Sequence, residues 1–185
     1  MSSINNKKVA LLVDNGFEES EFKKPFDAIK KAGGIPHLIS PQKSKVKSWA
    51  GEDWGPEYDV DKKLGDANAA DYDAIVLPGG QINPDLLRVN KDALAFVQHF
   101  IDNDKLIAAI CHAPWVLVEL DYVKGKKMTS YHSIVKDVKN AGADWQDKEV
   151  VIDGNLITSR SPKDLNAFNE AIIEMLSISD DEKIV

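Results

Sequence analysis

A cysteine followed directly by a histidine is the residue pair in this sequence best suited to catalysis. Cys111, the only cysteine among 185 residues, follows the apolar run LIAAI, and His112 comes next. A thiolate attacks carbonyl carbon, and imidazole exchanges protons near neutral pH. Cys111 is therefore either a small buried hydrophobic residue or a nucleophile presented by a sharp turn. His112 is either a general base or a packing and orienting residue.

Three acidic residues stand ahead of a predicted helix near the N-terminus. Glu18, Glu19 and Glu21 follow Gly16 in the segment GFEESEF. Acids at such a position most often complement the helix dipole on a solvated face. One of them turned inward against Cys111 would behave differently, because burial favours the protonated carboxyl, which can donate a hydrogen bond to a thiolate.

A pair of glycines ends another apolar segment. Gly79 and Gly80 follow Pro78, a pattern typical of a turn. The same pair would let two backbone N–H groups face a developing oxyanion without obstruction by side chains. Asp85, in the segment NPDLLR, opens a predicted helix, where a carboxylate usually complements the dipole.

Short apolar runs rich in β-formers alternate along the chain with segments of helical periodicity. Strands are predicted at residues 8–13, 35–40, 72–77, 105–110 and 126–130, with two more around a turn at 153–154. Residues 41–70 are the least regular, and we expect a short β excursion there, near Trp49 and Trp54.

Helices are predicted between these strands. Since proline suits a first turn, Pro25 predicts that the first helix begins near Phe22 to Lys24 and ends at the glycines 33 and 34. The others are predicted over residues 83–104 with Pro84 at the first position, and over 113–120, 133–142 and 161–176. Ser161 is the expected cap of the last helix, with Asp164 in a capping-box position.

This alternation predicts an α/β fold, a mainly parallel sheet with helices on both faces. We expect a single domain over residues 1–185, with its core at about 8–176 and a flexible tail at 177–185. Ligands of such sheets bind beyond the carboxyl ends of the strands. The acidic segment, the glycine pair and the Cys111 turn each follow a strand, so they should meet at one edge.

Composition excludes several classes of function. A net charge of −7 without a basic cluster argues against binding to nucleic acid or to an anionic membrane. No apolar stretch is long enough to span a bilayer or to form a signal-peptide core, so we expect a soluble, cytoplasmic protein. A single cysteine excludes a disulfide framework, and no histidine spacing suggests a metal site.

Six segments taken together resemble the ThiJ/PfpI family. They are GFEESEF, AIVLPGG, NPDLLR, AAICHAPWVLVE, VKGKKMTSY and VKNAGADWQDKEVVIDGNLITSRSPKDLNAFN. The resemblance extends over about residues 8–176. It implies the flavodoxin-like, three-layer fold of the class I glutamine-amidotransferase-like proteins. Amidotransferases of that fold use a His-x-Glu pair near the C-terminus, but no histidine follows His132 here, so that activity is not expected.

The resemblance also implies roles for individual residues. The family's nucleophile matches Cys111, its histidine matches His112, and its elbow-side glutamate matches Glu21. The backbone oxyanion donors match Gly79 and Gly80, together with the amide of His112. A tyrosine near the pocket matches Tyr131.

One matched residue implies an oligomer. In PfpI-type proteins an acid after the PGG loop of a neighbouring subunit orients the histidine, and its match is Asp85. The site would then be completed only in a homo-oligomer, a dimer or larger. Two positions depart from the family pattern: Ala113 replaces the glycine of CHGP, and Asp85 is shorter than the usual glutamate.

The resemblance implies a cysteine enzyme of stress defence that needs no cofactor. Its substrates would be small carbonyl compounds, above all reactive dicarbonyls, or modified proteins and peptides; intracellular peptidase activity is the second choice. The alternative is a redox sensor or chaperone that uses oxidation of Cys111. A purely structural domain with an inert Cys111 is the third interpretation.

Overall fold

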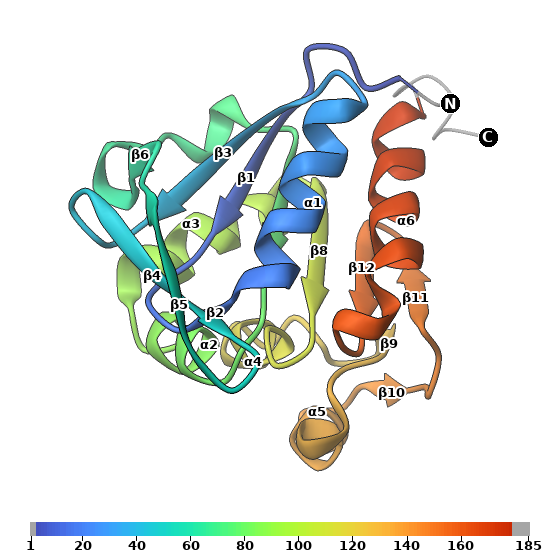
Figure 1. Ribbon diagram of the computed structural model, residues 1–185. Coiled ribbons are helices and arrows are strands. Elements are labelled where there is room, and N and C mark those ends of the chain that lie inside the picture. Colours follow the sequence, from blue (N-terminus) through green and yellow to red (C-terminus); the bar gives the residue numbers. More distant parts are fainter. Residues whose placement is uncertain (1–2, 179–185) are drawn as a thin grey trace.

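Residues 3–178, which the computed structural model describes, are built around a seven-stranded sheet in the order β11-β12-β8-β7-β1-β3-β6 (Figure 1). Its strands are β1 Lys8–Leu12, β3 Ile35–Ser40, β6 Lys62–Lys63, β7 Ala74–Leu77, β8 Leu106–Ile110, β11 Val150–Asp153 and β12 Leu156–Ser159. Neighbouring strands pair in parallel except β11 and β12, which form an antiparallel hairpin. The predicted strands at 8–13, 35–40, 72–77 and 105–110 and the hairpin around 153–154 are confirmed.

Helices cover both faces of this sheet. On one face lie α1 (Glu19–Lys31) and α6 (Leu165–Ser177), and on the other α2 (Ile82–Leu87), α3 (Lys91–Asp102) and α4 (Pro114–Glu119) (Figure 1). Alternate side chains of β1 are buried under the two helical layers. Val9 and Leu11 pack in the core under α1 and α6, while Ala10 and Leu12 pack in the core under α3 and α4. A central strand buried on both sides needs apolar residues at every position. The predicted three-layer α/β fold is confirmed.

The first helix begins earlier than predicted. It starts at Glu19 rather than near Phe22 to Lys24, so Pro25 lies in its second turn. Proline has no N–H, so only the bond to the Glu21 carbonyl four residues back is lost, and the helix continues. The early start puts Glu21 in the first turn, with its side chain on the buried face.

Two other helical predictions were wrong in detail. The predicted helix over 83–104 is interrupted, because Asn90 begins a new helix by accepting hydrogen bonds from the amides of Asp92 and Ala93. Pro84 is consequently the third residue of α2, not the first. Before α6, residues 162–164 form a 3-10 turn, and Ser161 makes no capping bond with its side chain. Asp164 binds Arg160 instead of completing a capping box.

The expected β excursion is a hairpin of β4 (Lys45–Ala50) and β5 (Asp53–Asp59), which joins the short β2 (Phe17–Glu18) in a second sheet. β9 (Lys127–Met128) pairs with β10 (Asp144–Trp145), and α5 (Val135–Asn140) lies between them in the chain.

No helix within residues 3–178 is long and apolar enough to cross a membrane. The predicted flexible tail falls, from residue 179 onward, outside the described residues.

Candidate active site

Cys111 stands on a sharp turn between β8 and α4. Its φ of +64° lies in the left-handed region that residues with a side chain rarely adopt. The turn is fixed on both sides, because the Cys111 amide donates to the carbonyl of Ser159 at 3.1 Å and its carbonyl accepts from the Tyr131 amide at 2.8 Å. Strain that the surroundings enforce in this way is typical of functional sites and resembles a nucleophile elbow.

The methyl group of Ala113 does not distort this turn. Ala113 has φ −57° and ψ −29°, ordinary helical values that require no glycine. Its side chain is buried in the core on the α3 and α4 side of the sheet. The departure from the family's glycine is therefore accommodated by packing.

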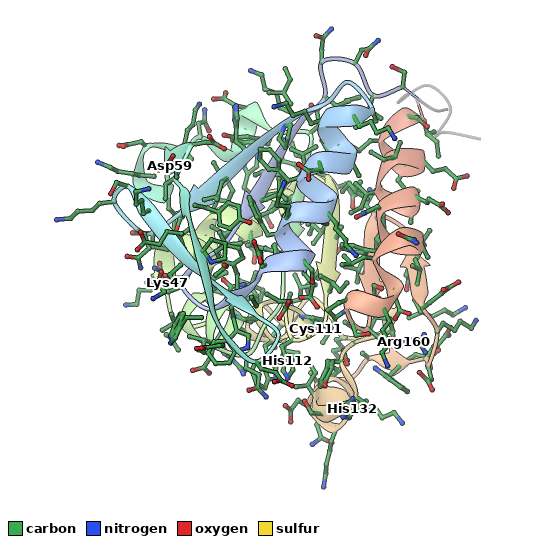
Figure 2. The ribbon with its side chains drawn as sticks, viewed as in Figure 1. Lys47, Asp59, Cys111, His112, His132 and Arg160 are labelled. Atoms are coloured by element: carbon green, nitrogen blue, oxygen red, sulfur yellow. The ribbon has the colours of Figure 1, made fainter. Side chains whose placement is uncertain are left out.

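His112 contacts the cysteine despite being its neighbour in the chain. Its Nδ1 lies 3.1 Å from Sγ of Cys111, and its Nε2 lies 3.0 Å from Oγ of Ser133. The ring of Tyr131 stacks on the imidazole at a centroid distance of 4.7 Å. Figure 2 shows Cys111 and His112 together where β8 ends. Burial lowers the pKa of His112 to about 4, with a smaller contribution from His132, so the imidazole is neutral at neutral pH.

Glu21 is completely buried next to the thiol. Its Oε2 accepts a hydrogen bond of 2.8 Å from the Gly79 amide, while Oε1 has no hydrogen-bond partner among the described residues. Burial raises the pKa of Glu21 to about 8, and nearby Glu18 adds to the rise against the opposing Gly79 bond. The carboxyl is thus protonated at neutral pH. Since Oε2 is an acceptor, the proton belongs on Oε1.

Two opposing influences act on the thiol. Burial raises the pKa of Cys111 above its usual range, and an ionised Glu21 would raise it further; the amides of Gly80 and His112, which point at the sulfur, lower it. At neutral pH Glu21 carries its proton, so the repulsion is absent and the proton on Oε1 is available for donation to a thiolate. Because burial is the larger influence, the resting sulfur keeps its proton, and the two amides and the Glu21 proton stabilise a thiolate only after a base has removed that proton.

The two glycines have different positions. A methyl group on Gly79 would lie 2.6 Å from Cβ of Cys111 and 2.5 Å from Oε2 of Glu21, so only glycine fits there. Its amide is already bonded to Glu21, which corrects the prediction that it faces an oxyanion. Gly80, with φ +82°, is the glycine whose amide points at the sulfur.

Asp85 lies apart from these groups within one chain. It is exposed on α2, and its side chain takes part in no hydrogen bond or ion pair found within residues 3–178. Ser133, not Asp85, bonds Nε2 of His112 in the same chain. An Asp85–His112 contact was expected only across a subunit interface, and that expectation stays a prediction.

A cavity of about 630 Å³ opens over the cysteine. Glu21, Gly80, Cys111 and His112 form its polar end, and among its other walls are Trp49, Tyr131 and Pro162. A larger hollow of about 770 Å³ between α1 and α6 holds none of the groups described above. Within residues 3–178 no cluster of three or more His, Cys, Asp or Glu side chains is placed to bind a metal ion.

Two residues at this site were not predicted from the sequence. Ser133 precedes a helix as many serines do, and its bond to His112 depends on the fold of the segment 129–134, for which the sequence carries no signal. Trp49 is a tryptophan in a polar segment, and the sequence does not indicate that it belongs to the site. Only the β4–β5 hairpin places it at the cavity.

Comparison with known proteins identifies the family of the chain. The model of the DJ-1/PfpI family matches residues 7–175. The putative cysteine protease YraA of Bacillus subtilis is 41% identical over 171 residues, 92% of this chain and 99% of that protein. Protein/nucleic acid deglycase 2 of Escherichia coli is 40% identical over 172 residues, 92% of this chain and 98% of that protein.

The same fold is found among solved structures. The crystal structure of Drosophila melanogaster DJ-1beta superposes with a TM-score of 0.86 at 31% identity, covering 96% of this chain and 94% of that one. The sequence match over nearly the whole chain and the shared fold lead to one conclusion: the chain belongs to the DJ-1/PfpI family.

Proposed function

We propose that the protein is a cysteine-dependent enzyme of stress defence, which acts on reactive dicarbonyl compounds or on the adducts that they form with proteins. The observation that carries the proposal is the 3.1 Å contact between Sγ of Cys111 and Nδ1 of neutral His112, beside the protonated Glu21. Relatives named as deglycases support the reaction class.

The first step is addition of sulfur to an aldehyde. His112 accepts the thiol proton on Nδ1, and the thiolate forms a C–S bond with the aldehyde carbon. The electron pair of the C=O bond moves to oxygen, which the amides of Gly80 and His112 stabilise. The imidazolium then returns the proton to this oxygen, and the product is a hemithioacetal on Cys111.

For methylglyoxal, a proton then moves from the sulfur-bearing carbon to the neighbouring ketone carbon through an enediol. The former aldehyde carbon is oxidised by two electrons and the ketone carbon is reduced by two, so the rearrangement needs no external oxidant or reductant. It leaves a lactoyl thioester on Cys111. Water cleaves the C–S bond and gives lactate, the free thiol and a regenerated His112.

We extend the proposal to the subunit arrangement. An exposed acid with no bond in its own chain is available to a second copy, so Asp85 of the partner subunit would reach Nε2 of His112 and share it with Ser133 or replace Ser133. Peptide cleavage is the related variant, suggested by the name of YraA, and it would use the same nucleophile. We rank it second because small carbonyls enter an edge cavity more readily than a folded polypeptide.

The unpartnered Oε1 of Glu21 favours one other function, redox sensing at Cys111. Two molecules of peroxide would convert the thiolate to a sulfinate with release of two waters, and the protonated carboxyl would donate to a sulfinate oxygen. A sensor gains a function on oxidation, whereas an enzyme is inactivated by it.

The test is formation of lactate from methylglyoxal by the wild type and by Cys111→Ala, with lactate itself measured so that reversible trapping of the dicarbonyl is not mistaken for turnover. Sustained turnover that the variant lacks supports the proposal. No lactate from either protein would refute the dicarbonyl activity and leave peptide substrates and the redox function to be tested.

A further inference from the structure

We propose that a second cavity, next to the one over Cys111, binds the polypeptide that flanks a modified cysteine side chain while Cys111 takes over its adduct. In that step the bond from the adduct carbon to Sγ of Cys111 forms as its bond to the carrier sulfur breaks, and the proton that His112 took from the Cys111 thiol goes to the departing carrier sulfur. The inference rests on the proposed function, because it concerns the same reaction. Among the adducts, it favours those carried by peptides and proteins over nucleotide adducts, whereas a free dicarbonyl needs only the cavity over Cys111.

The two cavities adjoin. The second has a volume of about 570 Å³ and shares Tyr131 and Pro162 with the cavity over Cys111. Cavities of roughly 300–1,000 Å³ are the size that holds a drug-sized ligand. Each of the two alone exceeds the needs of a three-carbon dicarbonyl, whereas both together suit a reactive group joined to a longer chain. Figure 2 shows His132 and Arg160, which line the second cavity, near the Cys111–His112 pair.

Aromatic walls of the second cavity are held in place by hydrogen bonds and stacking. The indole Nε1 of Trp145 donates to Oγ of Ser130 at 3.1 Å. The ring of Tyr131 contacts those of His112 and His132, with centroid distances of 4.7 and 4.3 Å. Such walls lose little conformational entropy when a ligand binds.

Arg160 supplies hydrogen-bond donors and holds two carboxylate acceptors in place. Three of its N–H groups donate to carboxylates, two to Asp164 at 2.8 and 3.0 Å and one to Asp147 at 2.9 Å. A guanidinium has five N–H groups, so two remain for a ligand. The Arg160 side chain is 34% exposed and that of Asp147 72% exposed. A peptide group has a C=O that accepts and an N–H that donates a hydrogen bond. The remaining N–H groups of Arg160 and the neighbouring carboxylates therefore match the two halves of a peptide group.

The charge of the cavity argues against a nucleotide. Arg160 and Lys163 are balanced by Asp147 and Asp164, so these four side chains of the lining give it no excess of positive charge. The whole chain carries −7. Phosphate recognition relies on an excess of positive charge. A neutral polypeptide backbone is the better fit.

The experiment compares three methylglyoxal adducts: that of N-acetylcysteine N-methylamide, which has no flanking residues, that of the pentapeptide Ac-Ala-Ala-Cys-Ala-Ala-NH2, and that of dGMP. Each carrier, the two thiols and dGMP alike, is used in an excess that leaves only a trace of free methylglyoxal, and lactate is measured. The variants are Trp145→Ala and Lys163→Ala in the second cavity, with the exposed Lys148→Ala as matched control.

The quantity compared is the preference for the peptide, that is, kcat/KM for the pentapeptide adduct divided by kcat/KM for the small thiol adduct. We expect Trp145→Ala to lower this ratio by about tenfold, because an aromatic contact with the peptide is lost. Most of the change should be in KM. Lys163→Ala should lower the ratio in the same direction, and Lys148→Ala should leave it unchanged. Ratios equal in all variants would overturn the proposal. So would a loss for the dGMP adduct as large as for the pentapeptide adduct, since that would assign the cavity to nucleotides.

A second measurement does not depend on turnover. The serine peptide Ac-Ala-Ala-Ser-Ala-Ala-NH2 is titrated into Cys111→Ser protein, and the indole N–H signal of Trp145, identified by its loss in Trp145→Phe, is followed by NMR. A saturable shift that Lys163→Ala weakens supports the cavity even if no lactate forms, in which case the proposed function alone fails. Turnover without any shift of this signal overturns the cavity proposal alone.

Discussion

The backbone amide of Gly79 donates a hydrogen bond of 2.8 Å to Oε2 of Glu21, although 58 residues separate them in the chain. This bond assigns the two carboxyl oxygens different roles, one as acceptor and one as the carrier of a proton next to Cys111. It also explains why the glycine is required, since a methyl group at position 79 would collide with both Glu21 and Cys111.

Glu21 should make activity depend on pH. Its pKa of about 8 means that the carboxyl loses its proton, and with it the ability to donate a hydrogen bond to the thiolate, as the pH rises through about 8. We expect kcat/KM of the wild type to fall above this pH. Glu21→Gln keeps an N–H donor that does not titrate, so the alkaline fall in its pH profile should disappear. The same fall in both proteins would contradict the assignment.

Glu21 should also make stability depend on pH. Its folded pKa is raised from 4.5 to about 8, so between these pH values the folded state binds more protons than the unfolded state, and stability falls as the pH rises. The loss is on the order of 4 kcal/mol. Urea unfolding at pH 5 and pH 8.5 should show a smaller decrease for Glu21→Gln than for the wild type. Equal decreases would show that Glu21 titrates normally.

Gly79→Ala should damage both fold and activity. The added methyl would meet the Ile110 carbonyl oxygen at 2.7 Å as well as Cβ of Cys111, and the backbone there cannot move freely. Overpacking of this kind costs about 1–3 kcal/mol. Gly65→Ala is the matched control, because its methyl would meet nothing within 4 Å. Equal urea midpoints for the two variants would mean that position 79 is not confined.

Ser133 is predicted to position His112. Ser133→Ala removes the hydroxyl that lies 3.0 Å from Nε2 of His112. Because the hydrogen bond that orients the imidazole is then lost, kcat should fall by about tenfold. Ser133→Thr keeps the hydroxyl and should restore the rate. A threonine variant as slow as Ser133→Ala would indicate a general packing defect in place of a specific bond to the imidazole.

Asp85 tests the subunit arrangement. Because it is exposed and unbonded within its chain, Asp85→Ala should change the unfolding free energy by no more than about 0.5 kcal/mol. If Asp85 of the partner subunit contacts His112, turnover should nevertheless fall, and the oligomer found by light scattering should remain. Asp92→Ala, an exposed acid in the first turn of α3, is the control and should keep full activity. Unchanged turnover in Asp85→Ala would remove this residue from the site.

Sequence reasoning succeeded where strand order alone decides the outcome. The acidic segment, the glycine pair and Cys111 each follow a strand of a parallel sheet, and the bonds of Glu21 to Gly79 and the contacts of Gly79 with Cys111 show that they meet. It failed where a tertiary contact overrides a local preference. Pro25 was expected near a helix start but lies in the second turn, and Asn90 divides a segment whose apolar spacing is continuous.

The hydrogen bonds around Cys111 and His112 could not be predicted from the sequence either. Which amide faces the sulfur depends on which one the Glu21 carboxyl occupies, and this is fixed by the buried face of α1. The Ser133 bond arises because the segment after β9 folds back over His112, as the 2.8 Å bond from the Tyr131 amide to the Cys111 carbonyl shows. Neither contact leaves a periodic pattern.

The central claim is that the sulfur of Cys111 bonds to the substrate carbon. The most direct measurement is a single turnover of methylglyoxal labelled with ¹³C at the aldehyde carbon, with protein in excess, stopped by acid and followed by digestion. We expect label on the peptide that contains Cys111, released by hydroxylamine as lactohydroxamate, and no label on the corresponding peptide of Cys111→Ala. Labelled lactate formed without any label on Cys111 would contradict it.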